Sequence, residues 1–203
     1  MKRPSKSEIQ AKIRASLVEE VAARGIGSVS VGAVAKRAGI SPGTIYLHFE
    51  NKDDMLQKVY LQIKTEFHTL IVAAKDETNS TAMIRRMWFD MFDFVSAYPY
   101  DFLFIENAGA AQVLTPEQAK DIAYMQDDIT GMLQKAIDDG TLAPLPVQTS
   151  VVLLVAPAMH LARTALLNNR SVTPEDSALT FERVWIAVSA ASPARSEKPK
   201  SKP

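Results

Sequence analysis

Apolar residues recur at the spacing of an α-helix along almost the whole of this chain. In the first such segment, 7–24, they recur every four residues, at Ile9, Ile13, Leu17 and Val21. This spacing is expected for the buried face of a helix. Eight or nine helices can be assigned in this way, and no segment has the alternating pattern of a convincing strand. The sequence therefore predicts an all-α fold.

Capping residues, glycines and prolines place the ends of these helices. Ser7 and Ser30 can each accept a hydrogen bond from a first helical turn, and Pro42 suits a first helical position. Gly25 and Gly39 can end the first two helices, because glycine adopts the left-handed cap conformation without strain. The expected helices span residues 7–24, 31–38, 42–49, 52–75, 81–97, 100–111, 116–139, 147–168 and 174–191.

The residue types that metal sites and most enzymes require are missing or scattered. The chain has no cysteine, and its three histidines lie far apart in the sequence, at His48, His68 and His160. We therefore expect no metal site. No nucleophile–base pair, P-loop or GxGxxG motif is apparent. The expected protein is neither an enzyme nor the carrier of a cofactor.

Two features bear on the cellular location. No uninterrupted apolar run reaches the ~18 residues that a membrane span needs. The first ten residues, MKRPSKSEIQ, are basic but are followed by a mixed amphipathic stretch, which argues against a signal peptide. We therefore expect a cytoplasmic protein with no membrane partner.

Charge is distributed unevenly along the chain, although the formal net charge is zero. Residues 1–52 carry nine Lys/Arg and four Glu, a net charge of +5. The net charge of residues 53–192 is −8, and that of residues 193–203 is +3. A basic first quarter on an acidic body indicates that one end faces a polyanion. Scatter alone also produces such a segment in some soluble proteins. The last segment is rich in Pro, Ser and Lys, so we expect a disordered basic tail.

The most informative segment is 31–52, VGAVAKRAGISPGTIYLHFENK. Two short helices joined by a tight turn at Gly39 match a helix-turn-helix. Ala35 must be small, because the second helix crosses close to it. The angle between the two helices is filled by apolar side chains, at Val34, Ile40 and Ile45.

Groups that bond to phosphate oxygens lie at or near one side of the second helix. They are Thr44, Tyr46, His48 and Lys52. Ile45 and Phe49, four residues apart, would anchor the opposite side, and such a helix is suited to the major groove of DNA. The alternative interpretation makes Tyr46 and His48 residues at the edge of the core and Lys52 a solvated cap. Each residue taken alone fits either interpretation.

The sequence GISPGTIYLHFENKDDML resembles the signature of the TetR/AcrR family of bacterial transcriptional regulators. The preceding SVSVGAVAKRAG and the long helix that follows resemble it too, so the likeness covers roughly residues 8–60. It implies an N-terminal three-helix DNA-binding domain containing the helix-turn-helix, at residues 1–52. It also implies a C-terminal helical domain for effector binding and dimerisation, at residues 53–192, with the tail at 193–203.

The resemblance implies two kinds of contact with DNA. The backbone would be held by Thr44, Tyr46, His48 and Lys52, together with Ser30 and Lys36 at the second helix. Base edges would be met by Ser41, Pro42, Gly43 and Leu47. Val31 and Gly32 stand where some relatives have polar or basic residues, so base reading from the second helix would be weak. Because Pro42 and Leu47 are apolar, contacts with thymine methyl groups are favoured over arginine–guanine pairs.

The central helices carry unusually many aromatic and methionine residues. Most of them, taken singly, are explained as core, but as a group they predict an apolar cavity. The candidate ligand-binding residues are Phe67, Met87, Trp88, Met91, Phe92, Phe102, Tyr124, Met125, Met159 and His160. We therefore expect a lipophilic or aromatic effector.

The last two helices contain more apolar residues than one inner face can bury. Large exposed apolar patches mark interfaces, and the family resemblance implies a four-helix bundle between two copies. The predicted interface residues are Val151, Val155, Leu161, Phe181, Val184, Trp185 and Val188. Pro157 should kink its helix, which could shape either the cavity or the interface.

Together these patterns predict a DNA-binding transcriptional regulator that responds to a ligand. Its partners would be double-stranded DNA, a small hydrophobic effector and a second copy of the chain, and its action would be that of a repressor. The alternative is a helical small-molecule-binding or interaction protein without sequence-specific DNA binding. Salt-dependent binding to DNA would separate the two, because only phosphate contacts release counterions.

Overall fold

The computed structural model describes residues 5–110 and 112–190. Within these residues the chain forms nine α-helices, two short 3₁₀-helices and no strand beyond an isolated bridge between Leu142 and Ser189. The expected tail, 193–203, lies outside the described residues. The α-helices are α1 (Lys6–Arg24), α2 (Val31–Ala38), α3 (Pro42–Tyr46), α4 (Lys52–Val72), α5 (Ser80–Ala97), α6 (Pro99–Ala110), α7 (Pro116–Asp138), α8 (Val147–Leu167) and α9 (Pro174–Val188). The 3₁₀-helices are η1 (Ile26–Ser28) and η2 (Ala73–Asp76).

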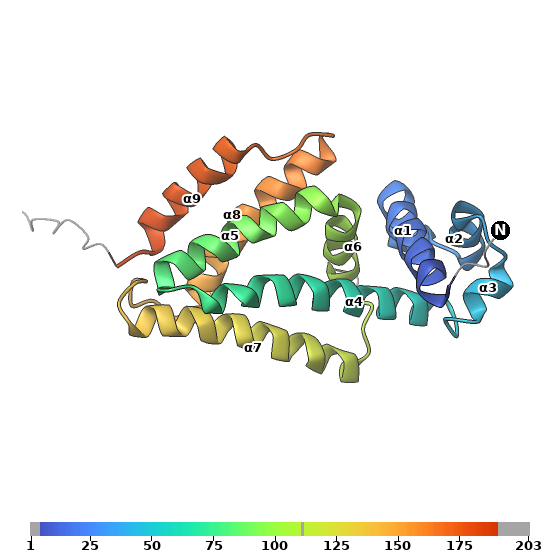
Figure 1. Cartoon of the computed structure of the whole chain (residues 1–203), viewed down its shortest axis with the longest axis horizontal. Coiled ribbons are helices and arrows are strands. Elements are labelled where there is room, and N and C mark those ends of the chain that lie inside the picture. Colours follow the sequence, from blue (N-terminus) through green and yellow to red (C-terminus); the bar gives the residue numbers. More distant parts are fainter. Residues whose placement is uncertain (1–4, 111, 191–203) are drawn as a thin grey trace, which may run out of the picture.

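The helices form a small cluster at one end of an elongated body (Figure 1). Helices α1, α2 and α3 make the cluster, and α4 runs from it along the length of the body beside α7. Helix α6 stands between α1 and the rest of the body, and α9 packs on α8 at the far end. This order of helices places one rod, α4, in contact with both parts of the molecule.

The predicted helix boundaries agree with the structure to within three residues. Helix α1 is capped by Ser5 rather than Ser7, because Ser5 and Glu8 form a reciprocal capping box: the Ser5 hydroxyl accepts from the Glu8 amide at 3.2 Å, and the Glu8 carboxylate accepts from the Ser5 amide at 2.6 Å. Such a box satisfies two backbone donors at once. Gly39 has φ 64° and ψ 35°, the left-handed cap expected at the turn.

Helix α3 is shorter than the predicted span 42–49. It ends at Tyr46, and the amides of His48 and Phe49 both donate to the Ile45 carbonyl, at 2.9 and 3.0 Å. The chain therefore turns tightly after one and a half helical turns. The outward direction of the residues after Leu47 cannot be read from helical periodicity.

A continuous apolar core extends through the cluster and the body. In the cluster, Leu17 of α1, Val34 of α2 and Ile45 of α3 are completely buried. In the body, Phe102 and Phe104 of α6 are equally buried. Because the core is continuous, a shift in the body can be transmitted to the cluster.

Helix α8 is the one helix of the described chain that is long and apolar enough, by length and composition, to cross a membrane. Its best window has a mean hydropathy of 1.7. A core helix of a soluble protein passes the same test, so this is weak evidence for a membrane span. Most of the window is nevertheless not buried inside the single protomer, which indicates an apolar face without a partner in this chain.

Candidate DNA-binding surface and effector cavity

Helix α3 presents one exposed side and is anchored from beneath. Ser41 caps it, because its hydroxyl accepts from the Thr44 amide at 3.1 Å, and Pro42 takes the first helical position. Ile45 is completely buried on the inner side. On the outer side, Tyr46 is 56 % exposed and Leu47 is 81 % exposed. Large side chains that are this exposed on a short capped helix are available to contact a partner.

Other predicted DNA-binding residues lie on α3 itself and on α2, which contacts it. Ser41, Pro42 and Gly43 are exposed at the start of α3, while Thr44 is partly buried and its hydroxyl lies 2.9 Å from the Ser41 hydroxyl. Ser30 is exposed and caps α2 by accepting from the Ala33 amide at 3.1 Å. Lys36, in the second turn of α2, is exposed as well. The caps therefore hold these hydroxyl groups in fixed positions.

His48 and Lys52 lie differently from the outward side chains. His48 is partly buried, and its Nδ1 atom is enclosed without a hydrogen-bond partner among the described residues. Lys52 is partly buried, and its Nζ donates to the Gly27 carbonyl at 3.4 Å, which ties the start of α4 to η1. The structure thus places these two residues closer to the alternative interpretation, at the edge of the core and at a helix cap.

The segment Gly39–Gly43 has the GxSxG spacing of a hydrolase nucleophile, which the sequence interpretation overlooked. A nucleophile elbow requires a turn from a strand into a helix. Here the segment joins two helices, and the Ser41 hydroxyl caps the second of them. The serine therefore has a structural role in the helix-turn-helix.

A buried carboxylate holds α1 against α2. Glu20 is 3 % exposed and accepts from Nε and Nη2 of Arg37 at 3.0 and 2.9 Å, while Arg24 lies 3.1 Å away on the other side. The hydrogen bonds that Arg37 donates to Glu20 raise the pKa of Arg37, and Glu19 adds to the effect. The positive charge of Arg37 is therefore balanced by carboxylates within the protein. Lys36 is the basic side chain of α2 that remains free. This ion pair was not predicted from the sequence. The signal for it is two adjacent glutamates on one helix followed by a short helix with basic residues.

The body contains a cavity of about 410 Å³ between α4, α5, α7 and α8. Five of the ten predicted ligand-binding residues lie in its wall, and they come from three of the four helices. They are Phe67, Met87, Trp88, Met91 and Met159. The Trp88 ring is fixed, because its Nε1 donates to the Ser177 carbonyl at 3.1 Å. The wall is therefore mainly apolar, with a rigid aromatic side.

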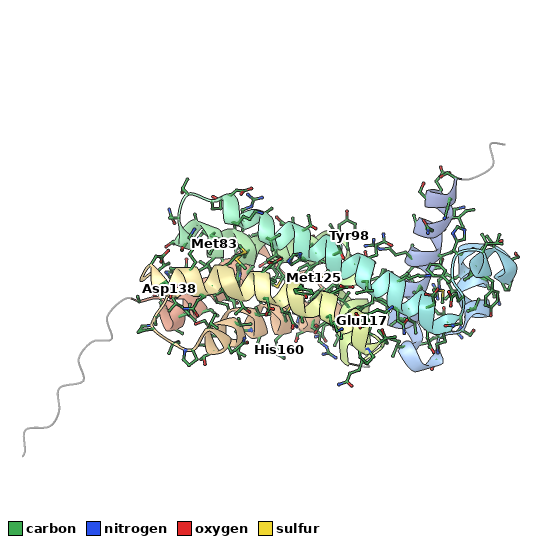
Figure 2. The ribbon with its side chains drawn as sticks, turned by 90° about the horizontal axis from the view of Figure 1, so that it is seen from below. Met83, Tyr98, Glu117, Met125, Asp138 and His160 are labelled. Atoms are coloured by element: carbon green, nitrogen blue, oxygen red, sulfur yellow. The ribbon has the colours of Figure 1, made fainter. Side chains whose placement is uncertain are left out.

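The other five predicted residues do not line this cavity. Phe92 and Phe102 are buried in the core, so they pack against other side chains instead. Tyr124 is 71 % exposed on α7, and Met125 beside it is partly buried (Figure 2). His160 is exposed on α8 and lies at the outer edge of the body (Figure 2). For three of these residues the adjacent position lines the cavity instead, because neighbouring residues on a helix differ by about 100° in direction. These adjacent residues are Met91, Gln126 and Met159.

Polar residues in the cavity wall come mainly from α4 and α7. Lys64 of α4 is the lysine among them, and sequence reasoning missed it. Its position, three residues before Phe67 on the same face of α4, is the signal that could have identified it. The remaining polar lining residues are Gln126, Asp127, Thr130 and Gln148.

The predicted dimer residues need correction. Phe181, Val184 and Val188 are buried inside the protomer, with the Phe181 ring centroid 5.4 Å from that of Trp88. They form the inner stripe of α9, which packs on α5 and α8. Val151 and Val155 line the cavity, although Val155 is also exposed, and Leu161 and Trp185 are partly buried. The large apolar side chains that remain exposed on these two helices are Val152, Val155, Leu167, Leu179 and Ile186.

An ion-pair cluster joins the helix cluster to the body. Arg14 of α1 donates to both carboxylate oxygens of Asp101 on α6, at 3.3 and 2.9 Å, and to Glu66 of α4 at 2.6 Å. Burial would lower the pKa of Arg14, but its hydrogen bonds to Glu66 and Asp101 outweigh burial and raise it. The same contact lowers the pKa of Glu66. Arg14 lies in the wall of an open cleft of about 960 Å³ between the two parts.

Comparison with known sequences identifies the N-terminal part. The sequence profile of the bacterial regulatory proteins of the tetR family matches residues 13–59. A curated relative from Haemophilus influenzae, an uncharacterised HTH-type transcriptional regulator, is 26 % identical over 189 residues, covering 92 % of this chain and 98 % of the relative.

Comparison with solved structures extends the likeness to the body. A TetR family transcription regulator from Marinobacter aquaeolei superposes with a TM-score of 0.79 and 24 % identity, over 89 % of this chain and 95 % of the other. The transcriptional regulator FadR from Bacillus subtilis, solved in complex with stearoyl-CoA, superposes with a TM-score of 0.68 and 19 % identity, over 90 % and 99 %. These similarities cover both the helix cluster and the helical body.

Proposed function

We propose that this chain, whose residues 13–59 match the sequence profile of the tetR family, is a DNA-binding transcription regulator of that family rather than an enzyme, and that it acts as a homodimeric repressor. In this proposal the dimer binds a near-palindromic operator in the cytoplasm. A lipophilic or aromatic small molecule binds the cavity between α4, α5, α7 and α8 and releases the protein from DNA. The DNA-binding domain comprises residues 1–52, and the remaining helices bind effector and partner.

The exposed side of α3 is the observation that carries the proposal. Tyr46 and Leu47 are exposed on a helix whose opposite side is fixed by Ile45, and Ser41 of the same helix start and Lys36 of the adjoining α2 are exposed as well. In this arrangement the phenol, hydroxyl and ammonium groups bind phosphates. Leu47 contacts base edges, where an apolar side chain favours the methyl group of thymine.

The exposed apolar residues of α8 and α9 support a homodimer. Val152 and Ile186 lie on helices that pack on each other at the end of the body opposite the helix cluster. A two-fold axis through this face places the two α3 helices in successive major grooves, about 34–36 Å apart. The interface therefore sets the spacing on which operator binding depends.

The apolar wall of the cavity supports a lipophilic effector. Its volume of about 410 Å³ lies within the range of small-molecule sites. Phe67, Trp88 and Met91 supply aromatic and flexible apolar contacts. The stearoyl-CoA bound by the Bacillus subtilis regulator carries a long apolar chain, which agrees with a lipophilic ligand for this chain.

Helix α4 is the element that couples the cavity to DNA. Its first residue follows the helix-turn-helix, Glu66 on it contacts Arg14 of α1, and Phe67 beside it lines the cavity. An effector that prefers a different position of α4 changes the spacing of the two α3 helices. A coupling free energy of about 1–3 kcal/mol lowers the affinity for DNA about 5- to 150-fold.

A fluorescence anisotropy titration of the full chain against the DNA upstream of its own gene tests this function. We expect binding that weakens steeply between two salt concentrations, because bound phosphates release counterions. Unrelated DNA of equal length is the control for specificity. An affinity that does not change with salt concentration, or equal affinities for the upstream and the unrelated DNA, would contradict the proposed operator binding.

A further inference from the structure

A lysine side chain lies in the wall of the otherwise apolar effector cavity. Lys64 is on α4 and is partly buried, and its Nζ lies 5.8 Å from the centroid of the Phe67 ring. Met87, Trp88 and Met91 of α5 supply apolar surface to the same cavity. The cavity therefore combines one ammonium group with a long apolar wall.

Lys64 forms no hydrogen bond or ion pair with any residue that the structure describes. Glu106 of α6 acts on it electrostatically, but Glu106 makes its ion pair with Arg163, at 3.9 Å. Burial lowers the pKa of Lys64, and Glu106 opposes this in part. An ammonium withdrawn from water without a close partner is costly. A bound anion would remove that cost and gain a charge-assisted hydrogen bond.

The other charged group in the wall does not compete for this role. Asp127 of α7 lines the cavity but is exposed, so its carboxylate remains hydrated and an ion pair with it would contribute little. Gln126, Thr130 and Gln148 can each donate a hydrogen bond to a carboxylate. Because these three groups can also accept hydrogen bonds, the preference for an anion over a cation comes from Lys64.

We propose that the effector is a compact carboxylate, an alkyl or aryl acid whose carboxylate binds Lys64 and whose apolar part lies against Phe67, Trp88 and Met91. This inference rests on the proposed function, because it specifies the ligand of the same cavity. The cavity volume of about 410 Å³ is near the lower end of the range of small-molecule sites. It suits a short acid better than an entire CoA thioester.

Calorimetric titration of the full chain with three ligands of equal chain length tests the proposal. The ligands are decanoate, decanol and decylamine. We expect decanoate to bind at least about tenfold more tightly than decanol, a difference of about 1.4 kcal/mol. Lys64→Met should remove this preference without changing the affinity for decanol, and Lys64→Arg should retain it. Lys75→Met, which removes an exposed lysine just after the same helix, should behave like the wild type.

Three outcomes overturn the proposal. The first is equal or weaker binding of decanoate than of decanol by the wild type. The second is a preference for decylamine that Asp127→Asn abolishes. The third is tight binding of decanoyl-CoA, unchanged in Lys64→Met, with weak binding of decanoate. Binding to upstream DNA is measured on the same samples, so a wild-type protein that binds this DNA but does not prefer decanoate overturns this inference alone.

Discussion

Tyr46 and Leu47 are neighbours on the exposed side of α3, yet we expect them to contribute differently to DNA binding. Tyr46→Ala removes the hydroxyl that we propose bonds to phosphate, so it should weaken binding to operator and unrelated DNA alike, by about tenfold. Leu47→Ala should instead reduce the ratio of operator to unrelated affinity. Anisotropy titrations with both DNAs measure this. Tyr124→Ala, which removes a more exposed tyrosine from α7, is the control, and unchanged affinity of Tyr46→Ala would reject the assigned contact.

Glu20 is a second residue with a specific expected effect, this time on stability. Glu20→Gln leaves Arg37 and Arg24 without their buried anion, so the free energy of unfolding should fall by about 2 kcal/mol. For a chain of this size the melting temperature should drop by roughly 4–8 °C. Thermal unfolding followed by circular dichroism tests this. Glu19→Gln, which alters the more exposed neighbouring carboxylate, should change the melting temperature little. Equal decreases in melting temperature in the two variants would contradict the expectation.

At the residue scale, the sequence predicted the helix-turn-helix more reliably than the direction of its side chains. Ser30, Gly39 and Pro42 have local roles that any short helix requires, so their positions could be predicted. His48 lies beyond the last residue of α3, where the chain turns and helical periodicity no longer applies. The pair of Glu20 with Arg37 depends on how α1 crosses α2, which no local pattern specifies.

At the element scale, the sequence predicted the apolar stripes of the helices but not the neighbour that covers each stripe. Helix α9 has an inner stripe at Phe181, Val184 and Val188 and an outer one at Leu179 and Ile186. Both stripes have helical spacing, and only the packing of α9 on α5 and α8 distinguishes them. The same limit applies to α7, where Tyr124 fits the aromatic composition of a cavity wall but lies on the exposed face.

The contact between α1 and α4 should depend on pH through Glu66. Its pKa lies below the ordinary value of 4.5, chiefly because Arg14 donates a hydrogen bond to it. A carboxyl with a lowered pKa stabilises the folded state above its unfolded pKa and loses that contribution as the pH falls through the folded pKa. The wild type should therefore melt at a higher temperature than Glu66→Gln at pH 6. This difference in melting temperature should shrink below pH 4.5. Glu182→Gln, an exposed change on α9, is the control, and a constant advantage would disprove the role of this ionisation.

At the scale of the whole molecule, helix α4 extends from the candidate DNA-binding surface to the far part of the body. The cluster of α1, α2 and α3 is at one end of α4, and α9 packs on α8 toward the other end of the body. Ligand in the cavity touches α4 between these two ends. In the proposed dimer the partner subunit is held at the far end, so a small tilt of α4 would be amplified at α3, where DNA fixes the spacing of the half-sites.

If the apolar face of α8 and α9 forms the dimer, breaking it should change how DNA binding depends on salt. Val152→Glu combined with Ile186→Glu places charges at positions that are 61 % and 68 % exposed in the protomer, so the protomer itself should remain helical. A monomer contacts about half as many phosphates, and the slope of log affinity against log salt should fall by about half. Sedimentation gives the mass, and anisotropy gives the slope. Tyr124→Glu changes a similarly exposed residue of α7 and should leave both the mass and the salt slope unchanged. A double variant that stays dimeric with an unaltered slope would place the interface elsewhere.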